Sequence, residues 1–139
     1  MAAKDIFHKT VCTALEKEGW IITHDPLFVK ASQKFKAYID LGAEKLLTAE
    51  KDRQKIAVEI KSFLGMSSIN EFHLAVGQFL NYRLALQQLE PERILYLAIS
   101  LDIYEELFLD LFIQQVIESY QIKLLVFYPN KKEVVLWKN

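Results

Sequence analysis

The chain has 139 residues, a formal net charge of −1 at pH 7, 52% hydrophobic and 25% charged residues, and only 4 glycines and 3 prolines. This length suits one domain with a substantial core, here residues 1–139, and the composition excludes fibrous repeats and disordered tails. The near-neutral charge argues against nucleic-acid binding driven by phosphate neutralisation over the whole surface.

The first half of the chain predicts one helix followed by three strands. Apolar residues at helical spacing indicate a helix over residues 5–18, with Asp5 as its cap and Gly19 as its stop. The strand candidates are an edge strand interrupted by Asp25-Pro26 (20–30) and two further strands (36–49 and 55–63) joined by a polar turn (50–54).

The second half predicts two long helices that alternate with strands. Ser68 and Glu71 form a capping box that opens a helix lasting to about Leu89. An apolar run predicts a strand buried on both faces, and a helix and a strand pair follow it; their ranges are 94–100, 102–120, 123–128 and 133–138. This order predicts an α/β fold with a mixed β-sheet flanked by helices.

The predicted helix over 102–120 is apolar around more than one face. Such a helix is either buried on both sides within the monomer or presents one side to another subunit, so a homo-oligomer stays open. No apolar stretch has the length of a signal peptide or of a membrane-spanning helix. We therefore expect a cytoplasmic protein without membrane contact.

Two acids and a lysine on neighbouring strands form the main candidate site. Glu59 and Lys61 share one face of their strand, because side chains alternate along a strand. Asp40, on the preceding strand, shares that face only if the hairpin pairs residues whose numbers sum to an odd value. A turn centred at 50–51 meets this condition and sets Asp40 opposite Lys61, with Glu59 as its diagonal neighbour.

Converging carboxylates indicate a divalent cation, because they repel one another unless one is protonated or a cation lies between them. Mg²⁺, or Mn²⁺ in its place, takes oxygen ligands, lowers the pKa of a bound water and neutralises charge on a phosphate. Lys61 would then orient that water or stabilise the developing negative charge. This is the chemistry of metal-assisted phosphodiester hydrolysis. A half-solvated amphipathic strand with a cross-strand ion pair also accounts for these residues.

Gln78 and Tyr82 lie one turn apart on one face of the second predicted helix. An amide can bind a water or a phosphate oxygen, and a phenol can stack on a base or donate to a phosphate. A helix edge packed against the sheet gives the same pattern, so the pair gains meaning only together with the acids.

In this combination the residues resemble the PD-(D/E)XK nuclease superfamily, whose common core is a helix, three strands, a helix and a strand. The resemblance implies a restriction-endonuclease-like core in which Asp40 is the superfamily's aspartate and Glu59-Ile60-Lys61 its acid-X-lysine triplet. Residues 78–82 resemble the glutamine-tyrosine helix motif of RecB-type nucleases. The chain departs from the pattern at Ile39, where the eponymous proline is missing.

The same resemblance supplies the expected roles. Asp40 and Glu59 are expected to bind the metal together with Ile60, which can offer only its backbone. The expected catalytic residues are Asp40, Glu59, Lys61 and Gln78, and Tyr82 is a possible contact to the DNA substrate.

More closely, five segments together resemble one family over the whole chain. They are Gly19-Trp20 with Ile22-Thr23-His24-Asp25-Pro26, residues 40–45, residues 56–63, residues 72–75, and Gly77-Gln78 with Asn81-Tyr82-Arg83. The family is XisH, the excision controlling factors of the fdxN element in cyanobacteria. The resemblance implies a role in excision of a DNA element, alongside a site-specific recombinase and a small partner called XisI. It leaves open whether the chain is a nuclease or a non-catalytic regulator on a nuclease scaffold.

Basic residues cluster in two places, at Lys30, Lys34 and Lys36 and again at 51–55. Lys34 and Lys36 are possible substrate-binding residues, although solvated loops carry such lysines as readily.

The remaining polar residues are weaker candidates. Glu16, Glu18 and Asp25 are each possible sources of an extra acid, although a solvated surface explains them as well. Cys12, the only cysteine, excludes an intrachain disulfide and a thiolate-rich zinc site, and we expect it in the core. The histidines have no second ligand at a metal-binding spacing and are expected to be structural or surface residues; they are His8, His24 and His73.

Overall fold

The main sheet has six strands in the order β1-β4-β5-β6-β7-β8, in a computed structural model that describes residues 6–47 and 53–139. Strands β2 and β3 form a separate antiparallel pair. Most neighbours in the main sheet are antiparallel, whereas β6 runs parallel to both β5 and β7. The strands are β1 (Ile21–His24), β2 (Leu27–Lys30), β3 (Lys36–Ile39), β4 (Leu41–Leu46), β5 (Arg53–Ile60), β6 (Arg93–Ser100), β7 (Leu124–Tyr128) and β8 (Glu133–Lys138).

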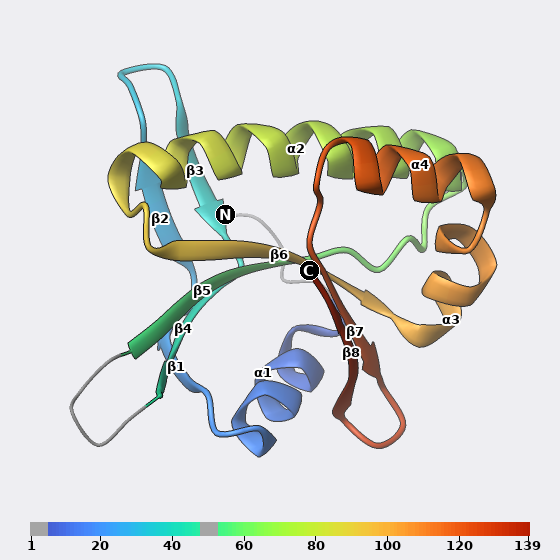
Figure 1. Ribbon diagram of the computed structural model, residues 1–139, viewed down its shortest axis with the longest axis horizontal. Coiled ribbons are helices and arrows are strands. Elements are labelled where there is room, and N and C mark those ends of the chain that lie inside the picture. Colours follow the sequence, from blue (N-terminus) through green and yellow to red (C-terminus); the bar gives the residue numbers. More distant parts are fainter. Residues whose placement is uncertain (1–5, 48–52) are drawn as a thin grey trace.

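Helices cover both faces of the main sheet (Figure 1). Helix α1 (His8–Lys17) lies on one face, and α2 (Ser68–Leu89) and α4 (Leu111–Ser119) lie on the other. Buried residues accordingly form two clusters, one between the sheet and α1 and one between the sheet and α2 with α4. The predicted mixed sheet with flanking helices is confirmed.

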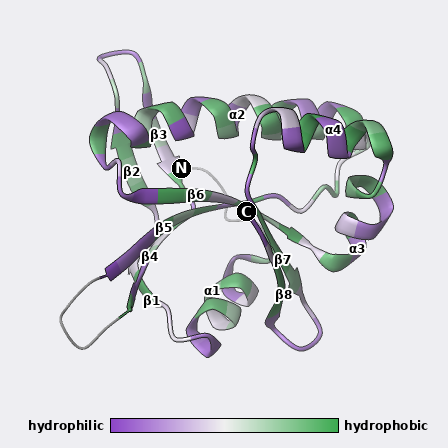
Figure 2. Ribbon diagram, viewed as in Figure 1, coloured by the Kyte–Doolittle hydropathy of each residue, from purple (hydrophilic) through white to green (hydrophobic). Residues whose placement is uncertain are grey.

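The alternation along β5 decides which side chains meet α2. Ile56, Val58 and Ile60 belong to the cluster on the α1 side, and Ala57 belongs to the cluster on the α2 side. Strand β5 begins hydrophilic, as its purple start in Figure 2 shows, and its residues are buried from Ile56 onward. Strand β6 contributes residues to both clusters, which confirms the prediction of a strand buried on both faces.

Two predicted strands are each divided in the structure. Residues 20–30 form β1 and β2, separated at the cis peptide bond between Asp25 and Pro26. The predicted strand over 36–49 is divided into β3 and β4, separated at Asp40, because the chain there leaves its pairing with β2 and joins β1 and β5; its last two residues lie outside the described residues. Such a change of partner leaves the alternation of side chains almost intact, so the pattern alone did not predict it.

Two predicted helix features were also wrong in detail. Ser67, not Ser68, caps α2 by accepting a hydrogen bond from the backbone N–H of Asn70 (3.2 Å). The predicted helix over 102–120 is divided into α3 (Leu101–Ile103), the π-helical η1 (Tyr104–Phe108) and α4. Asp110 starts α4 because its carboxylate accepts hydrogen bonds from the next helical N–H groups.

Two expectations fall outside the described residues, namely the Asp5 cap and most of the polar turn that follows β4. Within the described residues, no helix combines the length and the apolar character needed to cross a membrane.

Candidate active site

Asp40 and Glu59 meet where β4 begins and β5 ends. Leu41 pairs with Val58, so the hairpin has the odd-summed register that the shared face requires. The register differs by two residues from the predicted one and brings Asp40 into line with Glu59 instead of Lys61. The Asp40 N–H donates to Glu59 Oε1 (3.2 Å), and the Ile60 N–H donates to Asp40 Oδ2 (2.8 Å).

Burial makes this pair of carboxyl groups electrostatically unusual. Glu59 is 7% exposed. Burial first, and then the neighbouring Asp40 carboxylate, raise the pKa of Glu59 to about 8. Burial also raises the pKa of Asp40, against the opposing effect of the Ile60 N–H. The pair therefore holds a proton at neutral pH unless a cation compensates its charge.

Lys61 brings a positive charge close to Glu59. Its Nζ lies 3.6 Å from Glu59 Oε2 and favours the charged form of the carboxylate, although burial outweighs it. These residues line a cavity of about 390 Å³ between the sheet and α2. Its lining consists of Tyr38, Asp40, Glu59, Ile60, Lys61, Ser62, Phe63, Glu71, Leu74, Gln78 and Tyr82.

Helix α2 brings Gln78 and Tyr82 to the same cavity. Gln78 Oε1 is buried and has no hydrogen-bond partner among the described residues. Burial, followed by the charges of Glu59 and Asp40, raises the pKa of Tyr82, so its hydroxyl remains a donor at neutral pH. The helix thus offers an amide and a phenol to whatever fills the cavity.

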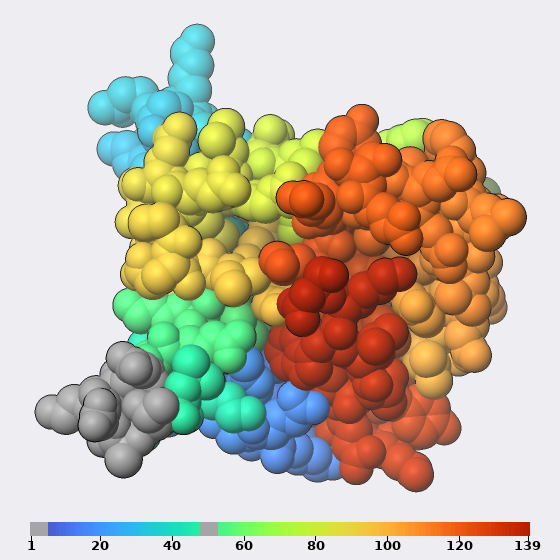
Figure 3. Space-filling view, viewed as in Figure 1, coloured from blue at the N-terminus to red at the C-terminus, as the bar shows by residue number. Residues whose placement is uncertain are grey.

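Ile60 takes part differently from the acids. Its N–H holds Asp40, while its side chain is buried on the α1 side of the sheet. Its role as a metal ligand stays a prediction. Lys34 and Lys36 are exposed and do not line the cavity; Lys34 lies in the segment between β2 and β3, which protrudes in Figure 3.

Of the lining residues that the sequence pattern did not indicate as site residues, two have titratable side chains. Tyr38 lies on β3 and Glu71 on the first turn of α2. Glu71 was predicted to complete a capping box, but its carboxylate accepts from the Gly65 N–H (3.1 Å to each oxygen). The available signal was the spacing of Glu71 and Gln78, which are about two helical turns apart on α2 and can therefore lie on the same face.

The other candidate acids lie elsewhere. Glu18 Oε1 accepts a hydrogen bond from Trp137 Nε1 (2.9 Å), and Glu16 is exposed on α1. Asp25 Oδ1 lies 2.7 Å from His8 Nε2. None of them lines the cavity that holds Asp40.

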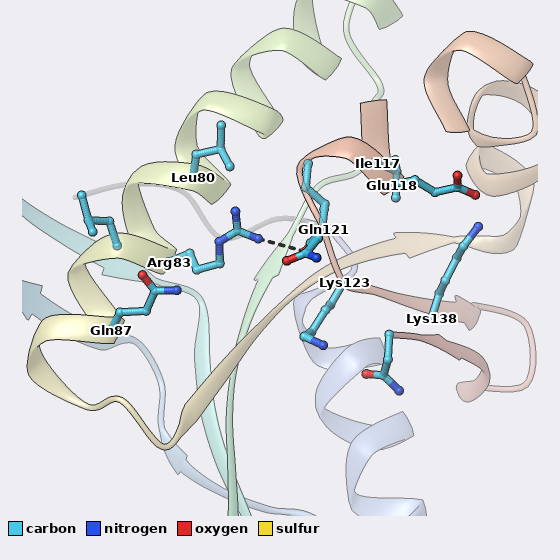
Figure 4. Close-up of a pocket in the computed structure, with 11 residues that line it drawn as sticks. Leu80, Arg83, Gln87, Ile117, Glu118, Gln121, Lys123 and Lys138 are labelled. Atoms are coloured by element: carbon cyan, nitrogen blue, oxygen red, sulfur yellow. Dashed lines mark hydrogen bonds between the residues drawn. The ribbon is translucent and has the colours of Figure 1, made fainter. Parts of the chain in front are cut away.

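A larger cavity of about 700 Å³ lies between α2, α4 and the β7–β8 pair (Figure 4). Basic groups dominate its charged lining, with Arg83, Lys123 and Lys138 against Glu118. Arg83 Nη1 donates to the Gln121 carbonyl across it (2.9 Å), as Figure 4 shows. Its described lining lacks a converging pair of carboxylates. The smaller cavity, which has Asp40 and Glu59, is therefore the better candidate for a metal site.

Comparison with known proteins identifies the family. A family model described as XisH protein matches residues 1–135. The chain belongs to the XisH family. No protein with a curated description matches this XisH chain.

Two solved structures are similar to this XisH chain over nearly its whole length. An XisH family protein from Nostoc punctiforme PCC 73102 is 42% identical, with a TM-score of 0.86, over 97% of this chain and 100% of that one. An fdxN element excision controlling factor protein from Anabaena variabilis is also 42% identical, with a TM-score of 0.84, over 98% of this chain and 100% of that one. The predicted family is therefore confirmed.

Proposed function

We propose that this XisH protein is an excision controlling factor for a DNA element and acts as a metal-dependent nuclease on DNA. The similar Anabaena variabilis protein is an fdxN element excision controlling factor, which supports the first part. The second part rests on one observation. Two hydrogen bonds, from the Asp40 N–H to Glu59 and from the Ile60 N–H to Asp40, hold these two acids together in a cavity that Lys61, Gln78 and Tyr82 also line.

The order of elements supports a restriction-endonuclease-like core. Helix α1, the antiparallel strands β1, β4 and β5, then α2 and β6, repeat the order helix, three strands, helix, strand. The β2–β3 pair is then an insertion between the first and second core strands. The acid-X-lysine triplet extends from the end of β5, with Lys61 held by its N–H to the Ala98 carbonyl (3.1 Å).

The donors of the cavity fit a hard divalent cation such as Mg²⁺ or Mn²⁺. One oxygen of each carboxylate is held by a backbone N–H, which leaves Asp40 Oδ1 and Glu59 Oε2 as ligand oxygens. A cation compensates the buried negative charge that otherwise keeps the pair protonated. When bound, it would lower the pKa of a water and neutralise charge on the scissile phosphate.

The remaining residues have separate tasks in this proposal. Lys61, 3.6 Å from Glu59, holds positive charge where negative charge develops on the phosphate. Gln78 offers its unpartnered amide oxygen to a water and its N–H groups to a phosphate oxygen. The protonated Tyr82 donates to a phosphate or stacks on a base, and Lys34 and Lys36 contact phosphates farther along the DNA.

A cleavage assay tests this function. Purified protein with Mg²⁺ or Mn²⁺ should cut at least one of linear, nicked, branched or single-stranded DNA, and Glu59→Ala should lose that cleavage. Glu105→Ala, an exposed acid on η1, is the matched control and should cut like wild type. Absence of cleavage, or equal cleavage by Glu59→Ala, contradicts nuclease activity.

A second function is favoured by the words controlling factor in the name of the Anabaena relative. In it the scaffold is non-catalytic and engages DNA, a recombinase or a small XisI-like partner. The exposed apolar side chains Leu111 (77%) and Phe112 (68%) on α4 are available for a protein partner or a second copy. This function predicts no metal binding at Asp40 and a partner affinity that Lys61→Ala leaves unchanged.

A further inference from the structure

A second group of metal-binding side chains lies outside the acid cavity, at the start of α1. His8 and Cys12 are four residues apart and therefore lie on one face of the helix. Asp25, from the connection between β1 and β2, reaches the same place. One donor atom from each residue lies within 4.8 Å of the other two.

The histidine of this group is buried and incompletely satisfied. Its ring is 5% exposed, and its Nε2 lies 2.7 Å from Asp25 Oδ1. Its Nδ1 is also buried but has no hydrogen-bond partner among the described residues. Buried polar atoms normally have a partner. Either ring nitrogen of a histidine can bind a metal, and Nε2 is the one that lies beside the carboxylate of Asp25.

We propose that His8, Cys12 and Asp25 form a binding site for Zn²⁺ or a similar borderline-soft divalent cation. Nitrogen, thiolate and carboxylate oxygen are the donors that zinc takes, and three protein ligands leave one tetrahedral position for water. Mg²⁺ prefers oxygen donors alone, so it is directed to Asp40 and Glu59 instead. The exposed Asp25 leaves the site open to ions from solvent.

Such a cation would link parts of the chain that are distant in sequence. It would fasten α1 to the connection between β1 and β2, in addition to the hydrogen bond between His8 and Asp25. His8 is also near enough to Asp40 to lower the pKa of that carboxyl when charged. A dication at His8 would therefore place positive charge behind the acid cavity.

Cobalt spectroscopy tests the site directly. Co²⁺ substitutes for Zn²⁺ and gives an ultraviolet charge-transfer band only when a thiolate is bound. Cys12 is the only cysteine, so any such band reports on this residue. Metal-free wild type should develop the band to one equivalent of Co²⁺, and Zn²⁺ should remove it. Cys12→Ser should show no band.

Affinity and stability keep the test independent of folding defects. Zn²⁺ should raise the Tm of wild type, and Asp25→Asn and His8→Gln should each bind Zn²⁺ at least about tenfold more weakly. His73→Gln, an exposed histidine on α2, should bind like wild type. Glu59→Gln should keep the cobalt band, so the result is independent of the proposed nuclease site. A Co²⁺ complex without the thiolate band, or a Zn²⁺ affinity unchanged in Cys12→Ser and Asp25→Asn, overturns the proposal.

Discussion

Asp40 and Glu59 hold one another through the backbone: the N–H of Asp40 donates to Glu59, and the N–H of the residue after Glu59 donates to Asp40. The two carboxyl groups therefore have a fixed separation before any ligand arrives. Preorganisation of this kind is what a metal site requires, because the ligands need not be ordered when the ion binds.

Metal affinity at this pair should depend on pH through Glu59. Its pKa of about 8 means that the proton must leave before a cation binds. We expect the affinity for Mn²⁺ to rise about tenfold per pH unit between pH 6 and 8, and to level above pH 8. Calorimetric titrations at several pH values measure this. A pH-independent affinity over that range would contradict the proton release.

The same carboxyl group should destabilise the metal-free protein at high pH. A carboxyl whose pKa is higher in the folded state binds its proton more tightly when folded, so the free energy of unfolding falls as pH rises from about 4.5 to about 8. Glu59→Gln removes this loss. Its Tm should exceed that of wild type by a margin that grows up to pH 8 and then stays constant.

Thermal unfolding in chelator across this pH range is the measurement. Glu105→Gln, on the exposed η1 segment, is the control and should show no such growing margin. An equal difference in Tm for the two variants, or a Glu59→Gln difference that shrinks as pH rises, would show that Glu59 does not cause this pH dependence.

Replacing Gln78 should raise the stability of the protein and lower its activity on DNA. Its buried Oε1 has no partner among the described residues, so Gln78→Met removes an unsatisfied polar group and should raise the free energy of unfolding by about 1 kcal/mol. The same change should weaken DNA binding and cleavage. Urea unfolding and a DNA affinity assay measure both effects, with the exposed Gln88→Met as control. A destabilised Gln78→Met variant with full activity would show that the amide serves only packing.

Ser67 and Ser68 should differ in their contribution to stability, because only Ser67 caps α2. Ser67→Ala removes the acceptor for the Asn70 N–H and should cost about 1 kcal/mol, whereas Ser68→Ala should be nearly neutral. Urea unfolding of both variants distinguishes them. Equal losses would indicate that the helix start is capped differently in solution.

Most of the sheet could be predicted from sequence because the mostly apolar stretches of β5 and β6 match the segments that are buried in the structure. The odd-summed register was also predictable, since it is the only way to put Asp40 and Glu59 on one face. The division at Asp40 was not, because it depends on β3 pairing with β2 and not with β5. The pairing partner of a strand is a property of the whole fold.

The candidate sites show the same limit. The acid-X-lysine triplet and Gln78 are visible as local patterns, whereas Tyr38 reaches the cavity only through the fold. His8 and Asp25 are 17 residues apart and meet through the connection between β1 and β2. No spacing rule for metal ligands covers that separation, so the sequence pattern alone did not place Asp25 beside the buried His8.

We propose that Asp40 and Glu59 share one divalent ion. Mn²⁺ titrated calorimetrically at pH 8 into wild type, Asp40→Asn and the exposed control Asp102→Asn tests it most directly. We predict one-to-one binding in wild type and Asp102→Asn that is lost in Asp40→Asn. Equal Mn²⁺ binding by wild type and Asp40→Asn, or none by wild type, would contradict the claim.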